Sequence, residues 1–393
     1  MTIAETIPDA MTLAHSLGTI CLVGAVIGCF FTLAACACVL GFPVAENEHL
    51  AVPPPVTILK PLYDAEPGLP ARLTAFCRQD YEAPIQILCG AHGQTSPVAA
   101  VVHAMEGELP DDSIELIVDP RHHGVNRKVS NLINIMPRVR HDTLVLSDSD
   151  IVVDPNYLRE LTARLAAPGV GAVTCLYHGI AGTGLWTQLS ALAINATFLP
   201  HAVTAVSLGL AKPCCGATIA IRRSMLERIG GFTALADTLA DDHAIGVGVR
   251  AQGYAVVTAP FVVGHCCFEG NLRELIRQQM RNARTIRCIN PLGYAGTIIT
   301  HPWPLALLAL LSGSSAAVMV SAAVLMARVL LCRCVEWRFN LPRQSYWLIP
   351  VQDLIAFGVY LTSFFGATVH WRGADYRVSA DGTLLEGQDL KGS

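Results

Sequence analysis

Hydrophobic and polar residues alternate in blocks along the middle of the chain. Short apolar runs are separated by stretches in which apolar residues recur every three or four positions. Strands that alternate with helices in this way are typical of an α/β fold with a mostly parallel sheet. The apolar runs cover 56–62, 85–91, 113–119, 143–150 and 170–178, and the helical stretches include 126–139 and 155–166.

Three longer apolar stretches lie outside this region, at 17–41, at about 304–327 and at about 346–366. Each is long enough to cross a hydrocarbon core of about 30 Å as a helix. The first contains LAAC (33–36), which resembles a processing site, but no Lys or Arg precedes Lys60. Because the basic region of a signal peptide is missing, we expect an uncleaved membrane helix.

The distribution of charge around these stretches bears on their orientation. Glu5 and Asp9 precede the first stretch, and a group of arginines precedes the second. Four more arginines (328, 333, 338 and 343) follow the second stretch, where three simple crossings would place them outside. The positive-inside rule disfavours that placement. One C-terminal segment is therefore a candidate re-entrant segment, with SGSS (312–315) as its break point.

Composition supports a membrane protein. Of the 393 residues, 52% are hydrophobic and 15% charged, against about 25% charged in an average soluble protein. The net charge of −4 gives no basic surface for nucleic acid. None of the fourteen cysteines has the C-x-x-C spacing that zinc favours, so we expect reduced thiols. The predicted organisation is a tail (1–16), a membrane anchor helix (17–41), a Pro-rich linker (42–55), a catalytic domain (56–290), C-terminal membrane segments (303–368) and a second tail (369–393).

Asp148 and Asp150 stand at the end of the fourth predicted strand. Ligands of parallel sheets bind at the carboxyl ends of the strands, where carboxylates are also least costly. Two carboxylates at alternate positions can hold one hard cation, which in turn bridges phosphate oxygens. An acidic turn before a helix that starts at Asp154-Pro155 is the alternative interpretation.

Two further groups of charged residues lie on predicted helices. Asp241 and Asp242 begin one helix, where acids stabilise the N-terminus, although one of them could instead accept a proton from a hydroxyl group. The stretch 272–287 places arginines 273, 277, 281 and 284 on one helical face. That face fits either lipid headgroups or a diphosphate.

These motifs, in this order, resemble the ceramide glucosyltransferase family, and most closely its bacterial relatives, the hopanoid-biosynthesis glycosyltransferases. The resemblance runs from ILKPLYDAEPGL (58–69) to VHWRGADYRV (369–378) and includes GVNRKVSNL (124–132), LSDSD (146–150), PCCGATIAIRR (213–223), LADDHAIG (239–246) and QQMRNARTIR (278–287). It implies a GT-A fold on the cytosolic side of a membrane, a UDP-sugar donor, a divalent cation (Mg²⁺ or Mn²⁺) and a lipid hydroxyl acceptor.

The resemblance also assigns roles to single residues. Asp148 matches the second aspartate motif, and Asp150 completes a metal-binding DxD. Asp242 matches the third motif and is the expected catalytic base. Gln278 and Arg281 match the first four positions of the Q/R-x-x-R-W signature. The expected donor-binding residues are Pro61, Asp64, Glu66, Lys128, Asp148, Gln278, Arg281 and Arg284.

Two positions depart from the family pattern. His92 or Gly93 stands where the first aspartate of the family is expected, within CGAHGQTSP (89–97). We expect Asp64 or Glu66 to take over its role in holding the nucleotide, and His92 is an alternative metal ligand. Asn282 replaces the tryptophan of the signature, which removes an aromatic surface near the acceptor.

The resemblance predicts an inverting glycosyltransferase in the bacterial inner membrane, with its catalytic domain in the cytoplasm. The expected reaction moves N-acetylglucosamine from its UDP-sugar to a hopanoid polyol (bacteriohopanetetrol). Transfer of glucose to ceramide is the alternative. The remaining hypotheses are a processive polysaccharide synthase and a non-catalytic membrane protein.

Overall fold

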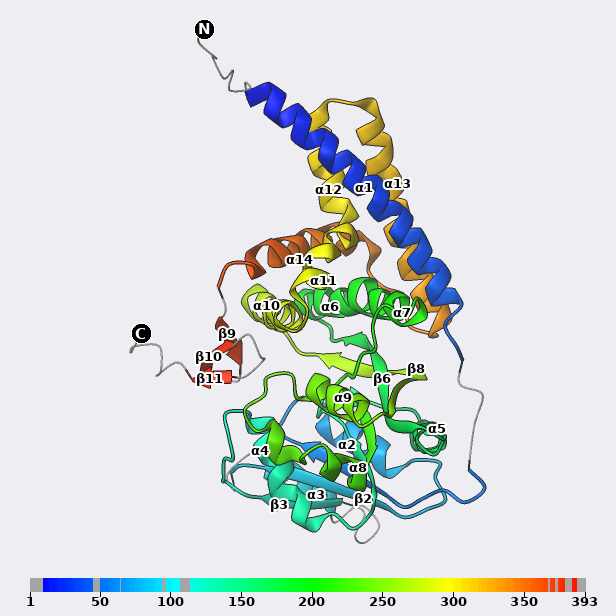
Figure 1. Cartoon of the computed structure of the whole chain (residues 1–393), viewed down its shortest axis with the longest axis vertical. Coiled ribbons are helices and arrows are strands. Elements are labelled where there is room, and N and C mark those ends of the chain that lie inside the picture. The colour runs from blue at the N-terminus through cyan, green and yellow to red at the C-terminus, as the bar shows by residue number, and fades with distance from the viewer. Residues whose placement is uncertain are drawn as a thin grey trace. The chain divides into compact units, whose positions relative to one another are not determined.

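The computed structural model describes residues 10–44, 50–63, 65–93, 97–106, 114–366, 368–371, 374–378 and 384–386. The chain divides into two compact units. The helical unit contains Met1–Phe42, Leu185–Ser207 and Glu269–Gly366, and the α/β unit contains Pro43–Gly184, Leu208–Phe268 and Ala367–Ser393. Figure 1 shows the elements of both units coloured along the chain.

An eight-stranded sheet forms the centre of the α/β unit, with the strand order β3-β2-β1-β4-β7-β6-β8-β5. Parallel pairs join β1 to β2 and β4, β2 to β3, and β6 to β8. β7 is antiparallel to both of its neighbours, and β5 is antiparallel to β8. The predicted mostly parallel α/β sheet is confirmed. The strands are β1 (Val56–Pro61), β2 (Ile85–Ala91), β3 (Ile114–Val118), β4 (Thr143–Leu146), β5 (Ile151–Val152), β6 (Val170–Ala181), β7 (Ile219–Arg222) and β8 (Ala255–Cys267).

Successive residues of a strand point to opposite faces of the sheet, so the apolar strands present apolar side chains on both faces. Helices cover each of these faces. Ile58 packs in the core with Phe76 of α2, whereas its neighbour Leu59 packs in a second core with Leu132 of α4. The first core also takes side chains from α3 and α5, and the second from α8 and α9. The helices are α2 (Leu69–Cys77), α3 (Pro97–Glu106), α4 (Arg127–Ile135), α5 (Tyr157–Leu165), α8 (Arg223–Arg228) and α9 (Asp241–Ala251).

Short elements complete the unit. Two 3-10 turns, η1 (Met136–Arg138) and η3 (Phe232–Leu235), follow α4 and α8. A separate antiparallel sheet with the order β11-β10-β9 lies in the C-terminal part, which we predicted to be a tail. Its strands are β9 (Thr368–Trp371), β10 (Ala374–Val378) and β11 (Leu384–Glu386).

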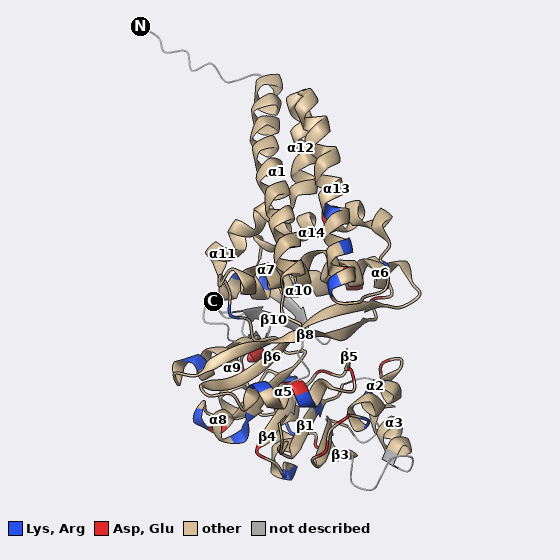
Figure 2. Ribbon diagram, turned by 90° about the vertical axis from the view of Figure 1, so that its right-hand side faces the viewer, with Lys and Arg blue, Asp and Glu red and all other residues tan. Residues whose placement is uncertain are grey.

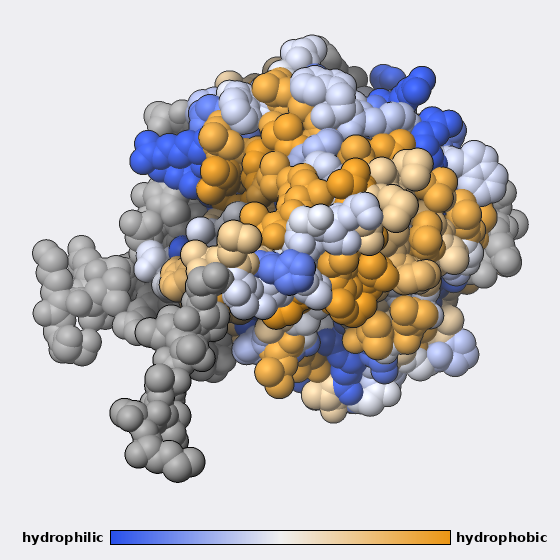
Figure 3. Space-filling view, turned by 90° about the horizontal axis from the view of Figure 1, so that it is seen from above, coloured by the Kyte–Doolittle hydropathy of each residue, from blue (hydrophilic) through white to orange (hydrophobic). Residues whose placement is uncertain are grey.

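Among the described residues, three helices of the helical unit are long and apolar enough to cross a membrane: Ala10–Leu40, Leu185–Ser207 and Ser315–Arg338. A further pair, Pro291–Thr300 and Pro302–Ser312, would pass the same test together, but it bends by 60°. Residues 10–40, 302–312 and 315–327 include no Lys, Arg, Asp or Glu, and the upper parts of α1, α12 and α13 are accordingly tan in Figure 2. Hydrophobic side chains dominate much of the surface seen from above in Figure 3.

The elements of this unit are mostly helices. They are α1 (Ala10–Leu40), α6 (Leu185–Leu192), the π-helix η2 (Ala193–Phe198), α7 (Leu199–Ser207), α10 (Leu272–Ile289), α11 (Pro291–Gly296), η4 (Thr297–Thr300), α12 (Pro302–Ala309), η5 (Leu310–Ser312), α13 (Ser315–Arg338), η6 (Tyr346–Leu348) and α14 (Ile349–Ser363). α6, η2 and α7 form one continuous helical segment.

The C-terminal membrane segments differ from the predicted ones. The stretch predicted at about 304–327 is interrupted, because Gly313 adopts a φ of 67° and Ser314 caps the start of α13. A helix break thus lies at the expected position, 312–315, while the re-entrant course stays a prediction. The apolar helix runs over Ser315–Arg338 instead. The stretch predicted at about 346–366 contains α14, whose 15 residues are fewer than the roughly 20 that a crossing needs. The apolar helix Leu185–Ser207 was not predicted as a span.

Candidate active site

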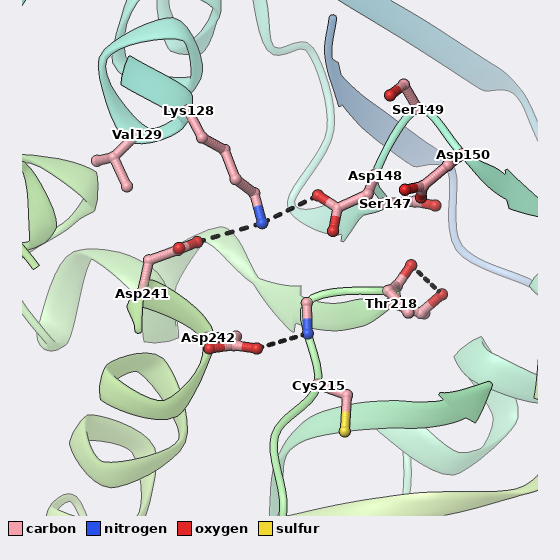
Figure 4. Close-up of polar contacts among 12 residues, drawn as sticks. Lys128, Val129, Ser147, Asp148, Ser149, Asp150, Cys215, Thr218, Asp241 and Asp242 are labelled. Carbon is pink, nitrogen blue, oxygen red and sulfur yellow. Dashed lines mark hydrogen bonds and ion pairs between the residues drawn. The ribbon is translucent and has the colours of Figure 1, made fainter. Parts of the chain in front are cut away.

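Four charged side chains of the α/β unit converge beyond the end of β4 (Figure 4). Asp148 follows β4, Lys128 lies in the first turn of α4, and Asp241 and Asp242 begin α9. Lys128 Nζ lies 2.9 Å from Asp148 Oδ1 and 3.4 Å from Asp241 Oδ2. The sequence predicted Lys128, Asp148 and Asp242 as site residues, and the structure brings these three together.

Lys128 supplies the positive charge of this group. Burial alone would lower the pKa of Lys128, but Asp148, Asp241 and Asp242 together raise it well above its ordinary value. The side chain therefore stays charged at any physiological pH. It compensates part of the repulsion among the three aspartates.

Asp242 has the environment of a general base. Its Oδ2 accepts a hydrogen bond from the Gly216 amide at 2.8 Å, and its Oδ1 accepts one from the His243 amide at 2.7 Å. Burial, and then the charge of Asp241, raise the pKa of Asp242 to about 6, while Lys128 and the two amides act in the opposite direction. The carboxylate is thus ionised at neutral pH, yet more basic than an ordinary aspartate.

Gly216 brings the main chain close to these groups. A Cβ atom at this position would lie 3.2 Å from Lys128 Nζ, 3.3 Å from Asp242 Oδ2 and 3.6 Å from Asp148 Oδ2. A side chain larger than hydrogen would therefore crowd the ammonium group and the Asp242 carboxylate. A glycine at this position lets its amide approach Asp242 and donate to it.

Lys60 of β1 makes a second set of contacts, which hold the turn between Asp148 and Asp150 in place. Lys60 is fully buried, and its Nζ donates to Ser147 Oγ at 3.1 Å and to the Asp148 carbonyl at 2.8 Å. The same atom lies 3.5 Å from the centre of the Phe76 ring. Burial lowers the pKa of Lys60 to about 7 although Asp148 and Asp150 favour its charged form.

Glu66 holds the same turn from the other side. Ser149 Oγ donates to Glu66 Oε1 at 3.0 Å, and Arg72 Nη2 donates to Glu66 Oε2 at 2.9 Å. Arg72 Nε also donates to the Ser149 carbonyl at 2.8 Å. Both carboxylate oxygens of Glu66 are therefore engaged within the protein, which supports a positioning role rather than the predicted contact with the nucleotide.

Asp150 has a feature that suits a cation. Its Oδ1 is buried and forms no hydrogen bond among the described residues, while its Oδ2 lies 3.5 Å from His265 Nδ1. Burial alone would raise the pKa of Asp150, but His265, Lys60 and Arg72 together lower it. An ionised carboxylate with an unpaired buried oxygen is costly unless a cation or water meets it.

The residues present fit a cation that keeps part of its hydration shell. Within the described ranges, no three His, Cys, Asp or Glu side chains form a ready-made metal site. Two carboxylates, from Asp148 and Asp150, are the protein ligands that the turn offers. Mg²⁺ commonly binds through one or two carboxylates, with water and substrate phosphates completing its octahedron.

The structure also describes Pro61 and His92, two further residues that the sequence singled out. Pro61 ends β1 and is buried, and Asp64 lies outside the described residues. His92 Nδ1 lies 3.2 Å from the Asp119 carbonyl and Nε2 lies 2.9 Å from the Arg127 carbonyl, so both ring nitrogens face main-chain acceptors. The alternative role of His92 as a metal ligand therefore has no support in this geometry.

Gln278, Arg281 and Arg284 belong to α10 of the helical unit, whereas the aspartates belong to the α/β unit. Within the helical unit, Arg284 Nη2 donates to the Phe365 carbonyl at 3.1 Å. Arg287 Nη2 donates to the Gly366 carbonyl at 2.8 Å. These two arginines thus bind main-chain carbonyls just beyond the C-terminal end of α14.

Sequence reasoning missed Lys60, Arg72, Gly216 and His265. A single lysine inside the apolar run VTILKPL is a signal that could have identified Lys60, because a buried ammonium needs acceptors nearby. The others had no comparable signal. Their roles depend on which turns the fold brings together.

Known proteins share this sequence pattern and fold. The profile of "Glycosyl transferase family 21" matches residues 20–384. An "N-acetylglucosaminyltransferase" of Azorhizobium caulinodans is 22% identical over 248 residues, which are 61% of this chain and 62% of that protein. "Ceramide glucosyltransferase 1" of Caenorhabditis elegans is 19% identical over 217 residues, which are 54% of this chain and 46% of that protein. The chain thus matches about half to three fifths of the length of these relatives.

One solved structure is similar over most of the chain. The mannosyltransferase PcManGT from Pyrobaculum calidifontis, in complex with GDP-Man and Mn2+, superposes with a TM-score of 0.55 at 19% identity. The match covers 90% of this chain and 99% of that protein. The predicted GT-A-like fold is confirmed by this similarity.

Proposed function

The chain belongs to glycosyl transferase family 21, and from that premise we propose that it transfers a sugar from a nucleotide-sugar donor to a lipid hydroxyl group. The observation that carries the proposal is the convergence of Asp242, Asp148 and Lys128 around Gly216. It places a candidate general base near a candidate cation-binding carboxylate, and a glycosyl transfer needs both at the reacting carbon.

The proposed base is Asp242. Its carboxylate takes the proton of the acceptor hydroxyl as that oxygen attacks the anomeric carbon from the face opposite the leaving diphosphate. The Gly216 and His243 amides hold the carboxylate in place without neutralising it. Because one displacement occurs on one face, the configuration at the anomeric carbon inverts.

The leaving diphosphate is the proposed ligand of the Asp148–Asp150 turn. A bound Mg²⁺ or Mn²⁺ would stabilise the charge on the departing oxygens as a Lewis acid. Lys128 orients Asp148 and adds a positive charge beside it, while Glu66 and Arg72 keep the turn rigid. Gln278, Arg281 and Arg284 remain proposed donor ligands on the basis of the family signature.

We propose UDP as the nucleotide, with Pro61, Asp64 and the β2 end near His92 and Gly93 around the base. The proposed sugar is N-acetylglucosamine and the proposed acceptor a hopanoid polyol. The bacterial relative named N-acetylglucosaminyltransferase supports the sugar. The relative named ceramide glucosyltransferase supports a second candidate, transfer of glucose to ceramide.

The proposed location is the bacterial inner membrane, with the α/β unit in the cytoplasm. Arg338 Nε at the end of α13 donates to the Phe42 carbonyl at 3.0 Å, just beyond the end of α1. Both helices therefore end on the side from which the chain enters the α/β unit. Arginines 333, 338 and 343 fall on that side, and the conflict with the positive-inside rule disappears.

Lipid analysis of cells that carry or lack the gene tests this proposal. We expect one glycolipid to disappear on deletion and to return with the wild-type gene but not with Asp242→Asn. Its mass and fragments would identify the sugar and the lipid. A lost polymer would indicate a polysaccharide synthase, and unchanged lipids and polymers would contradict a transferase role.

A further inference from the structure

The helical segment Leu185–Ser207 is apolar enough to cross a membrane over its 23 residues. In the chain it is inserted between β6 and β7 of the central sheet. Its composition suggests a crossing, but the pairing of the two strands that flank it imposes a different arrangement.

β6 and β7 are neighbours in the sheet. They pair in antiparallel register, with Ala172 opposite Ile221 and Thr174 opposite Ile219. Both strands must therefore lie on the same side of the membrane. If the helix crossed, residues 208–218 would have to return through the hydrocarbon core. They form neither helix nor strand, and unpaired main-chain groups there cost several kcal/mol each.

We propose that Leu185–Ser207 lies in the plane of the membrane, on the side of the α/β unit, and does not cross it. The partner of this helix is the boundary between lipid headgroups and hydrocarbon. The inference concerns membrane topology and does not depend on the proposed reaction.

Contacts within the helical unit show where the segment Leu185–Ser207 meets α1 and α13. The His201 ring lies 5.6 Å from the Phe31 ring of α1, and the Ala196 carbonyl accepts from Arg328 Nη1 of α13 at 2.7 Å. Phe42 and Arg338 are in contact at the ends of α1 and α13. Phe31 and Arg328 each lie about 15 Å further back along their own helix from that contact. The segment thus meets both helices at one level, and Figure 1 shows α7 beside the lower end of α1.

That level fits the edge of the hydrocarbon core. Residues 10–31 of α1 contain no Lys, Arg, Asp or Glu and extend about 33 Å, close to the roughly 30 Å of a bilayer core. Arg328 and Asp353 form a buried ion pair at the same level, with Nη2 and Oδ1 2.6 Å apart. Charged pairs are rare deeper in the core.

Apolar side chains flank the segment at both ends. Leu185 is 44% exposed at its start, and Leu208 and Leu210 are 57% and 74% exposed just after its end. Exposed leucines are favoured where they can enter the outer part of the hydrocarbon. The lipid surface therefore covers both ends of the segment, which anchors the β6–β7 part of the sheet to the membrane.

Labelling with a membrane-impermeant amine reagent tests the proposal in the full-length protein. Lys212 is a native, exposed lysine that follows the segment. Thr183→Lys places a second amine in the exposed turn before it, and Ile3→Lys marks the opposite end of α1. Each protein is labelled in sealed inverted vesicles and in intact cells, and peptides are identified by mass spectrometry.

We expect Lys212 and the Thr183→Lys amine to react from the same face, and the Ile3→Lys amine to react from the other. Native Lys212 decides the question even if Thr183→Lys does not accumulate. Labelling of Lys212 from the face of Ile3→Lys would overturn the proposal, because the segment would then cross. Labelling of Lys212 from neither face would also overturn it, because residues 208–218 would then lie within the bilayer.

Discussion

Lys128 Nζ lies 2.9 Å from Asp148 Oδ1, and this ion pair joins the first turn of α4 to the turn that follows β4. The same ammonium group lies 3.4 Å from Asp241 Oδ2 at the start of α9. One lysine therefore connects three separate elements at the candidate active site. The other oxygen of Asp148, Oδ2, lies on the side of Gly216, 3.6 Å from the Cβ position of that residue.

Lys128→Met should both destabilise the protein and remove activity. Removing one partner of a fully buried ion pair costs about 3–5 kcal/mol. The cost here is smaller, because the Asp148 side chain is 36% exposed and water screens its charge. We expect a lower midpoint of denaturant unfolding and a transfer rate reduced more than about hundredfold. Lys212→Met, at an exposed lysine of the same unit, is the control and should change neither quantity. A Lys128→Met protein with wild-type stability would contradict the assigned charge balance.

Transfer should fall as the pH drops through about 6, because the base must be ionised and the pKa of Asp242 is raised to about 6. Below that value, the rate should fall about tenfold per pH unit. Asp242→Asn should remove transfer at every pH. Initial rates between pH 5 and 8 test this, and loss of transfer in Asp241→Asn but not in Asp242→Asn would move the base to Asp241.

The same raised pKa affects stability. Between about pH 4 and 6 the folded protein binds this proton more readily than the unfolded chain does. The contribution of Asp242 to the free energy of unfolding therefore decreases as the pH rises through this range. Asp242→Asn removes that cost, so its thermal unfolding at pH 7.5 should occur no lower than that of the wild type. A lower melting temperature would point to a structural role for Asp242.

The site residues that the sequence predicted are those whose position depends only on the neighbouring strand or helix. Asp148 and Asp150 follow a strand and Asp242 starts a helix, so strand and helix patterns alone place them at the ends of elements. Glu66 was predicted to hold the nucleotide, and this stays a prediction. Its contact with Ser149, 83 residues away in the chain, was not predicted. No local pattern carries that information.

The same reasoning explains the errors in the membrane segments. α1 is uniformly apolar and was predicted from its length alone. Leu185–Ser207 contains Asn195 and His201. In the structure, Asn195 Nδ2 donates to Gln344 Oε1 at 3.2 Å, and the His201 ring packs against the Phe31 ring. These contacts join segments far apart in the chain, so the sequence pattern alone did not show that the two polar residues belong to an apolar helix.

Glu66→Ala should weaken cation binding rather than nucleotide binding as such. It removes the acceptor of Ser149 and the partner of Arg72, and hydrogen bonds to charged groups are worth about 1.5–3 kcal/mol. We expect the cation concentration for half-maximal transfer to rise about tenfold or more, and less in Glu66→Gln. Glu82→Ala, at an exposed site, is the control. Equal weakening of UDP binding with and without the cation would restore Glu66 as a nucleotide ligand.

Gly216→Ala should leave the fold intact and abolish transfer. Gly216 does not have a positive φ, so alanine can adopt its backbone conformation. The new methyl group would crowd Lys128 Nζ and Asp242 Oδ2 and displace them. Gly358→Ala in α14 is a matched control, because no atom lies within 4 Å of its Cβ position and its φ is not positive either. Wild-type transfer in a folded Gly216→Ala protein would show that the reaction does not depend on the positions of Lys128 and Asp242 around Gly216.

The central claim is that this chain moves a sugar from a nucleotide to a lipid in a reaction that depends on a cation. The most direct measurement uses purified wild-type protein in liposomes that contain lipids of a hopanoid-producing bacterium, with radiolabelled UDP-N-acetylglucosamine and Mg²⁺ or Mn²⁺. The account predicts label in one organic-soluble glycolipid, and loss of that label with EDTA, with Asp148→Ala and with Asp242→Asn. Label that stays in the aqueous phase for this donor and for UDP-glucose with added ceramide would contradict the account.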